Sequence, residues 1–150
     1  SELNAREERG TNIVISGLIE SNADDATDRK DHDKAAVKDA LQHLRPDVDD
    51  DEIESVFRSG KKLDDRPRLA IVRLRNSDMK NALLRKARTT AIPGEIKIRS
   101  DLTKSEREEE TRFFKKLREA EAANPNVVFR VTGPPGRRKF IKAKEQLTNH

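Results

Sequence analysis

The sequence predicts an α+β protein built from short strands and amphipathic helices. Short runs rich in Ile, Val and Leu are typical of strands, and the segments between them repeat apolar residues at helical spacing. The composition adds a third observation, because 33% of the 150 residues are hydrophobic and 40% are charged. A modest core with a heavily charged surface is therefore expected, as one ordinary domain or a small domain with an appendage.

The first 31 residues are expected to contain one strand. Residues 1–10 are polar and permit a helix, so they are predicted to be the end of an upstream helix or a tail. NIVISGL, residues 12–18, combines β-branched residues with a closing Gly17 and is the expected first strand. IESNADDATDRKD, residues 19–31, has the composition of a loop.

A helix and a second strand are expected next. The helix covers residues 33–45, because Pro46 blocks its continuation and an apolar stripe runs through Ala36, Val37, Ala40, Leu41 and Leu44. The acidic stretch DVDDDE then leads into a strand at residues 55–59. This stretch resembles the start of a calcium loop, but Glu52 replaces its glycine and Arg58 its final glutamate, so a capping turn or a solvated loop is preferred.

The third strand, residues 69–75, lies in RPRLAIVRLRN and should point alternate side chains to opposite faces. One face would carry Ala70, Val72 and Leu74, and the other Leu69, Ile71 and Arg73. Ser77 can cap the following helix, whose apolar stripe is Met79, Leu83, Leu84 and Ala87. A fourth strand is expected at residues 96–100.

The resulting order, β-α-β-β-α-β, is typical of a ferredoxin-like domain. Such a domain has a four-stranded antiparallel sheet with two helices on one face and the other face open, as in the RNA-recognition motif. We assign residues 11–102 to it. Residues 103–150 are expected to form a small C-terminal domain, a helix with capping-box spacing at Thr103 and Ser105, followed by a hairpin around TGPPGRR. This smaller part is expected to lean on the first because its own core is limited.

Charge is unevenly distributed along the chain. Residues 1–57 contain 7 Lys and Arg against 16 Asp and Glu, whereas residues 58–150 contain 25 against 12. This asymmetry favours a polyanion-binding surface in the last two thirds of the chain, with a solvated basic surface as the alternative.

No motif for catalysis, metal or cofactor binding is recognisable, so the protein is not expected to be an enzyme. There is no cysteine, and the histidines have no partner at metal-ligand spacing. SGKK lacks the first glycine and the final Ser or Thr of a P-loop. The chain also shows no signal peptide and no long apolar segment, which favours an intracellular soluble protein.

Four stretches resemble the nucleic-acid-binding region of the first open reading frame protein of LINE-type (non-LTR) retrotransposons. They are ERGTNIVISGL, FRSGKK, RPRLAIVRLRNSDMKNALLRKAR and IKIRSDLTKSERE, and the match as a whole spans about residues 9–120. The resemblance implies an RNA-recognition-motif-like domain and a small C-terminal domain that form a cleft for single-stranded RNA or DNA. It also implies a protein that coats its transcript and acts as a nucleic-acid chaperone, in cytoplasmic ribonucleoprotein particles or also in the nucleus. Members of the family trimerise through an upstream coiled coil, so a homotrimer is expected only if the full-length protein has one.

The candidate nucleic-acid-binding residues are all basic. Arg88 matches the last arginine of the family's LRxAR segment, and the others cluster in the basic part of the chain. The full set is Arg58, Lys61, Lys62, Arg66, Arg68, Arg73, Arg75, Arg85, Arg88, Arg99, Arg137, Arg138 and Lys139. The last three are expected at the tip of the hairpin, as a flexible basic finger.

The sequence departs from an ordinary RNA-recognition motif in its lack of aromatics. Leu69 and Ile71 occupy the usual stacking positions, and the chain has no Trp, no Tyr and 5 Phe. Phosphate contacts and guanidinium stacking are therefore expected to dominate, with little sequence specificity. The alternative function is a protein–protein interaction module that uses the aliphatic sheet or a helical face.

Overall fold

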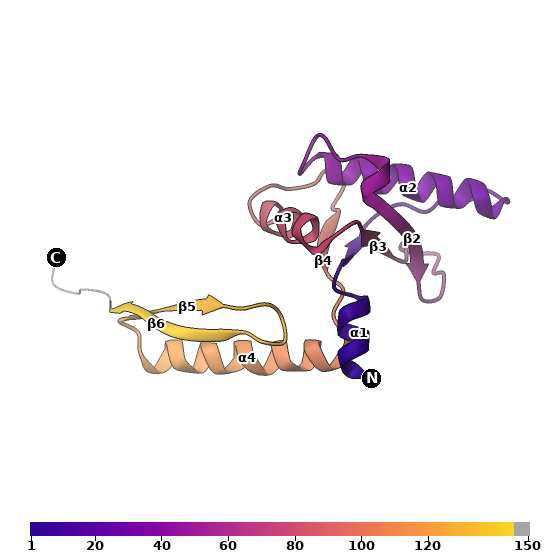
Figure 1. Ribbon diagram of the computed structural model, residues 1–150. Coiled ribbons are helices and arrows are strands. Elements are labelled where there is room, and N and C mark those ends of the chain that lie inside the picture. The colour runs from indigo at the N-terminus through magenta and orange to yellow at the C-terminus, as the bar shows by residue number, and fades with distance from the viewer. Residues whose placement is uncertain (146–150) are drawn as a thin grey trace. The chain divides into compact units, whose positions relative to one another are not determined.

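The structure is a computed structural model that describes residues 1–145. The chain forms two compact units (Figure 1). The sheet unit is Leu3–Asp101, and the hairpin unit comprises Ser1, Glu2 and the residues from Leu102 onward. The chain begins with α1 (Glu2–Glu8), and the sheet unit continues with β1 (Asn12–Ser16), α2 (Ala26–Gln42), the 3₁₀ turn η1 (Asp50–Glu52), β2 (Ile53–Ser59), β3 (Leu69–Leu74), α3 (Ser77–Ala87) and β4 (Lys97–Ser100).

The sheet unit contains a four-stranded sheet in the order β2-β3-β1-β4, with every neighbouring pair antiparallel. β3 and β1 are central, and Val72 of β3 lies opposite both Ile13 of β1 and Val56 of β2. The predicted α+β class is therefore confirmed. Strands β2 and β4 form the two edges of this sheet.

One face of the sheet packs against α2 and α3 and forms the core. Alternate strand residues such as Ile13, Ile15 and Val72 are fully buried and belong to one apolar cluster with Leu41 of α2 and Leu83 of α3. The predicted alternation along β3 is confirmed, because Ala70, Val72 and Leu74 join this cluster whereas Leu69, Ile71 and Arg73 do not. Burial of these side chains, each contributing about 1.5–3 kcal/mol, is the main stabilisation of the unit.

Two helix starts differ from the predictions. α2 begins at Ala26 rather than near Asp33, because Asp25 caps it by accepting a hydrogen bond from the backbone N–H of Thr27 at 2.8 Å. α3 is capped by Asn76 rather than by Ser77, since the Asn76 side chain accepts a hydrogen bond from the backbone N–H of Met79 at 2.9 Å.

Gly17 permits a close approach between two segments of the sheet unit. Its φ is +82°, and a Cβ at this position would lie 2.7 Å from the backbone oxygen of Glu95. Glu95 itself has a φ of +61°, which is rare for a residue other than glycine. The turn after β1 is thereby packed directly on residues 95 and 96, just before β4.

The hairpin unit consists of α4 (Lys104–Ala123), β5 (Val127–Thr132) and β6 (Lys139–Glu145). The predicted capping box at Thr103 is confirmed, as its hydroxyl accepts from the N–H of Glu106 and the Glu106 carboxylate accepts from the N–H of Thr103. β5 and β6 pair antiparallel as the predicted hairpin. Edge-to-face rings fill the space between helix and hairpin, namely Phe113, Phe114, Phe129 and Phe140.

Candidate nucleic-acid interface

The sheet face that points away from α2 and α3 presents cations from two strands. The register places Arg73 of β3 beside Asn12 of β1 and places Arg99 of β4 beside Val14 of β1. Lys97 lies two residues before Arg99 and therefore points to the same face. Arg73 and Arg99, which were predicted separately, are brought to one surface.

The exposed charges among the paired residues of this face are cationic. Arg73, Lys97 and Arg99 are exposed, whereas Val14 and Ile71 in the middle of the face are buried. Among the paired residues of β1–β4 on this face, none is Asp or Glu. The paired residues therefore offer a polyanion positive charge, and the exposed carboxylate of these strands is Glu54, at the bulge of β2 next to Ser55, the partner of Arg73.

Asn12 links Arg73 to the end of the sheet unit. It is 5% exposed, and its Nδ2 donates to Oδ2 of Asp101 at 3.1 Å while its Oδ1 accepts from Nε of Arg73 at 3.5 Å. The other carboxylate oxygen of Asp101 pairs with Arg9 at 3.6 Å. Asn12 thus orients the Arg73 side chain through Nε. The terminal nitrogens of Arg73 make no hydrogen bond within the described residues.

The other predicted cations of the sheet unit surround the sheet at its loops and at one helix end, and most are exposed. The exposed ones are Lys61, Lys62 and Arg66 in the loop between β2 and β3, Arg75 directly after β3, and Arg85 and Arg88 at the end of α3. Arg88 and Lys97 line the same hollow, about 620 Å³, between the end of α3 and the edge strand β4.

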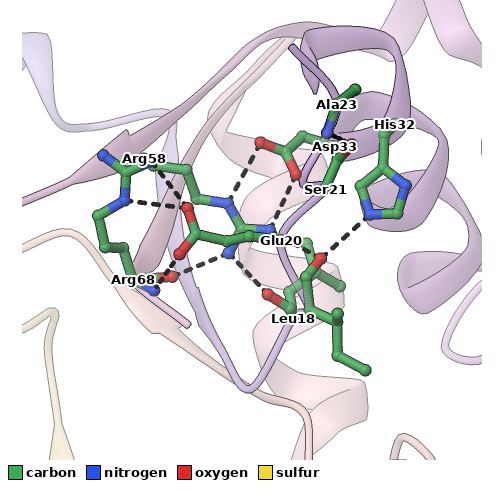
Figure 2. Close-up of polar contacts among 9 residues, drawn as sticks. Leu18, Glu20, Ser21, Ala23, His32, Asp33, Arg58 and Arg68 are labelled. Carbon is green, nitrogen blue, oxygen red and sulfur yellow. Dashed lines mark hydrogen bonds and ion pairs between the residues drawn. The ribbon is translucent and has the colours of Figure 1, made fainter. Parts of the chain in front are cut away.

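Arg58 is placed differently from an exposed binding residue. Its side chain is 5% exposed, and Nε and Nη2 donate to the Asp33 carboxylate at 3.2 and 2.9 Å. Nη1 donates to the carbonyls of Leu18 and Arg68, and Nη2 also donates to that of Ile19 (Figure 2). These bonds use all five guanidinium donors, so none remains for a phosphate.

Arg68 also binds a carboxylate of the same chain, that of Glu20. Its Nε and Nη2 donate to Oε1 of Glu20 at 2.9 and 2.7 Å, and its backbone N–H donates to Oε2 at 3.0 Å (Figure 2). Burial acts to raise the pKa of Glu20, but these hydrogen bonds and the attraction of Arg68 and Arg58 outweigh it and lower the pKa below its ordinary value of 4.5. Glu20 is therefore ionised at neutral pH and holds Arg68 in place.

In the hairpin unit, Arg137 and Lys139 are exposed, but Arg138 is bound to α4. Nε of Arg138 donates to the Glu110 carboxylate at 2.7 and 2.9 Å, and the backbone N–H of Gly136 donates to the same carboxylate at 3.3 Å. The guanidinium also lies 5.6 Å from the ring centre of Phe114. The expected flexible finger is, at Arg138, a turn that is tied to the helix.

Two residues on the cationic face were missed in the sequence. Lys97 has the same strand parity as Arg99, and Phe57 alternates with Val56 of the core and lies opposite Ile71. Phe57 is 52% exposed, so the face does have one accessible aromatic ring. The alternation of side chains along each strand predicts both positions. Phe57 lies outside the usual aromatic positions of an RNA-recognition motif, which correspond here to Leu69 and Ile71.

The described residues contain no helix long and apolar enough to cross a membrane, and they form no cluster of His, Asp and Glu suited to a metal ion. Comparison of the chain with models of protein families and with curated protein sequences gives no match.

Proposed function

We propose that the protein binds single-stranded RNA and DNA through phosphate contacts, without catalysing a reaction on them. The observation that carries this proposal is the sheet face on which Arg73, Lys97 and Arg99 are exposed with no carboxylate among the paired strand residues. Phosphate contacts by Lys and Arg supply most of the sequence-independent affinity for nucleic acids. Little sequence preference follows, because phosphates carry no base identity.

We propose further that the sheet unit is a ferredoxin-like, RNA-recognition-motif-like domain. The sheet order β2-β3-β1-β4, the antiparallel pairs and the placement of α2 and α3 against one face support this proposal. In RNA-recognition motifs, the nucleic acid lies on the sheet face that the helices leave open.

The biological role that we propose is that of a retrotransposon-type protein which coats its transcript and acts as a nucleic-acid chaperone in ribonucleoprotein particles. The resemblance of residues 9–120 to the LINE-type family supports this role, and its densest part, residues 66–88, covers β3 and α3. Sequence-independent phosphate binding suits a protein that must cover a transcript along its length.

A protein–protein interaction module is the second candidate function. It would use the aliphatic residues of the sheet, but Ile71 is 8% exposed and Val14 3% exposed, which leaves the 52% exposed Phe57 as the large exposed apolar side chain among the paired residues of this face. Since an apolar interface needs accessible apolar surface, the burial of these two positions favours nucleic-acid binding over protein binding.

The proposal is tested by fluorescence anisotropy with a short labelled single strand. The double variant Arg73→Gln, Arg99→Gln removes two cations from the face, and we expect it to bind at least about tenfold more weakly, a loss of about 1.4 kcal/mol. The matched control is Lys34→Gln, Lys38→Gln, which lowers the net charge equally on α2, the helix packed against the opposite face.

Equal losses in the two double variants would mean that net charge, rather than this face, determines binding. Unchanged affinity in the Arg73 and Arg99 variant would contradict the proposed interface directly. Urea unfolding of each variant tests whether a change acts through the fold. Substitutions at exposed positions usually alter stability by no more than about 0.5 kcal/mol, and the pair of Lys38 with Asp50 at 3.3 Å is a surface pair that contributes about 0–1 kcal/mol.

A further inference from the structure

An open hollow of about 620 Å³ lies at the β2 edge of the sheet unit. Its walls are the segment after β1, the first turns of α2, and residues 56–58 of β2 with Lys62. The Arg58–Asp33 and Arg68–Glu20 pairs form part of these walls and fasten the segment after β1 and α2 to β2 and β3 (Figure 2). The hollow therefore has a preformed frame, and its volume lies in the range of small-ligand sites.

Phe57 is one of the residues that line this hollow. It lies on the open sheet face opposite Ile71 and is 52% exposed. The other Phe residues lie in the hairpin unit, where each packs against another ring. Phe57 is thus the one phenylalanine of the sheet unit, and a base that stacks on it would meet the walls of the hollow.

The charges around the hollow favour an anionic ligand. Besides Arg58 and Arg68, its cations are Arg29, Lys30 and Lys62, which form no ion pair within residues 1–145. Nη1 of Arg29 donates to the backbone carbonyls of Ala23 and Asp24 at 2.8 and 2.7 Å. The carboxylates of Glu20 and Asp33 are occupied by Arg68 and Arg58, which leaves the exposed Asp24 as the lining carboxylate without an ion pair among the described residues. Positive charge beside an exposed ring suits a nucleotide, which carries both a phosphate and a base.

We propose that this hollow holds one nucleotide of the bound strand, with its base stacked on Phe57 and its phosphate facing Lys62. The inference rests on the proposed function, because the strand on the cationic face would supply the nucleotide. It adds one stacking position to an interface otherwise made of phosphate contacts. Stacking is tolerant of base identity, so it adds affinity without sequence preference.

The first test compares a natural oligonucleotide with an abasic one of equal length, which keeps every phosphate and lacks the bases. Phe57→Ala should weaken binding of the natural strand by about 5- to 150-fold, the range for loss of one stacked base, and should leave binding of the abasic strand unchanged. Phe57→Tyr is the matched control, because it keeps an aromatic ring and should retain the affinity of the original protein. Urea unfolding of each variant ensures that the fold is intact.

A second test uses the absence of Trp and Tyr from the chain. In Phe57→Trp the new indole is the dominant intrinsic fluorophore, and the natural strand should quench it whereas the abasic strand should not. Leu3→Trp, at a position that is 66% exposed on α1 and outside the hollow, is the control and should be quenched much less.

The outcomes separate this inference from the proposed function. If the unmodified protein binds the natural strand and Phe57→Ala binds it equally well, the nucleotide site is wrong while the phosphate interface stands. Equal weakening of both strands by Phe57→Ala, or equal quenching of the two Trp variants, also overturns the stacking site. If the unmodified protein binds neither strand, the proposed function itself fails, and the nucleotide site fails with it.

Discussion

Replacement of Arg58 by Met should reveal a structural residue rather than a binding residue. Arg58 was predicted from its place in FRSGKK to contact nucleic acid, but its side chain is 5% exposed and its guanidinium donates to Asp33 and to three backbone carbonyls. Met has a similar length and no charge, so it keeps much of the packing and removes every one of these hydrogen bonds. The Asp33 carboxylate, 12% exposed, would then be buried without its partner.

The expected loss in the free energy of unfolding is about 3–5 kcal/mol, because removing one partner of a buried ion pair leaves an uncompensated charge. A domain of this size has about 5–15 kcal/mol in total, so the loss is a large fraction of its stability. The double variant Arg58→Met, Asp33→Leu removes both charges and should recover the part of that loss that comes from the unpaired carboxylate. The carbonyls of Leu18, Ile19 and Arg68 lack their donor in both variants, so the rest of the loss should remain. Arg73→Met is the matched control, and at its exposed position it should change stability by no more than about 0.5 kcal/mol.

Urea unfolding followed by circular dichroism measures these differences, and anisotropy with a labelled single strand measures affinity under conditions where each variant is folded. Arg58→Met should lose stability and keep affinity, and Arg73→Met should do the reverse. The reasoning is refuted if Arg58→Met unfolds at the same urea concentration as the original protein and binds the strand more weakly. Arg58 would then belong to the interface.

Three further predictions concern stability and the two units. The pKa of Glu20 is lowered in the folded state, so its contribution to stability is present above about pH 4.5 and is lost as the pH falls through the folded pKa. Glu20→Gln should therefore lower the free energy of unfolding at pH 7 and reduce its decrease with falling pH, both measured by urea unfolding. Gly17→Ala should cost at least about 1–2 kcal/mol in urea unfolding, because φ is +82° and the new Cβ would meet the Glu95 oxygen, whereas unchanged stability would contradict this turn geometry. A chain ending at Leu102 should keep a folded circular dichroism spectrum and bind single strands more weakly with a shallower salt dependence; full affinity would make the hairpin unit a scaffold only, and loss of the folded spectrum would place the unit boundary elsewhere.

The strands and their faces could be predicted because strand parity is local. The alternation of Leu69 and Ile71 with Ala70 and Val72 separates the two faces of β3, and the structure has the same separation. Helix starts were predicted less well, since the first turns of α2 are polar and have no apolar stripe, and the cap at Asp25 was not recognised.

The roles of individual arginines could not be predicted from the sequence. Arg58 pairs with Asp33, 25 residues away, and Arg138 pairs with Glu110, 28 residues away. A basic residue on a strand has the same local pattern whether it meets solvent or a distant carboxylate. The fold determines which arginines remain exposed. In the sheet unit Arg73 and Arg99 are exposed, whereas Arg58 is buried against Asp33.

The central claim is that phosphates bind to the cationic face of the sheet unit, and the salt dependence of affinity tests it most directly. Contact with roughly five phosphates predicts a slope of about −3.5 for log K against log salt concentration on a single strand, at about 0.7 per contact. The double variant Arg73→Gln, Arg99→Gln should have a slope shallower by about 1.4, whereas Lys34→Gln, Lys38→Gln should keep the original slope. An affinity that hardly changes with salt, or a slope that the Arg73 and Arg99 changes leave untouched, would contradict the account.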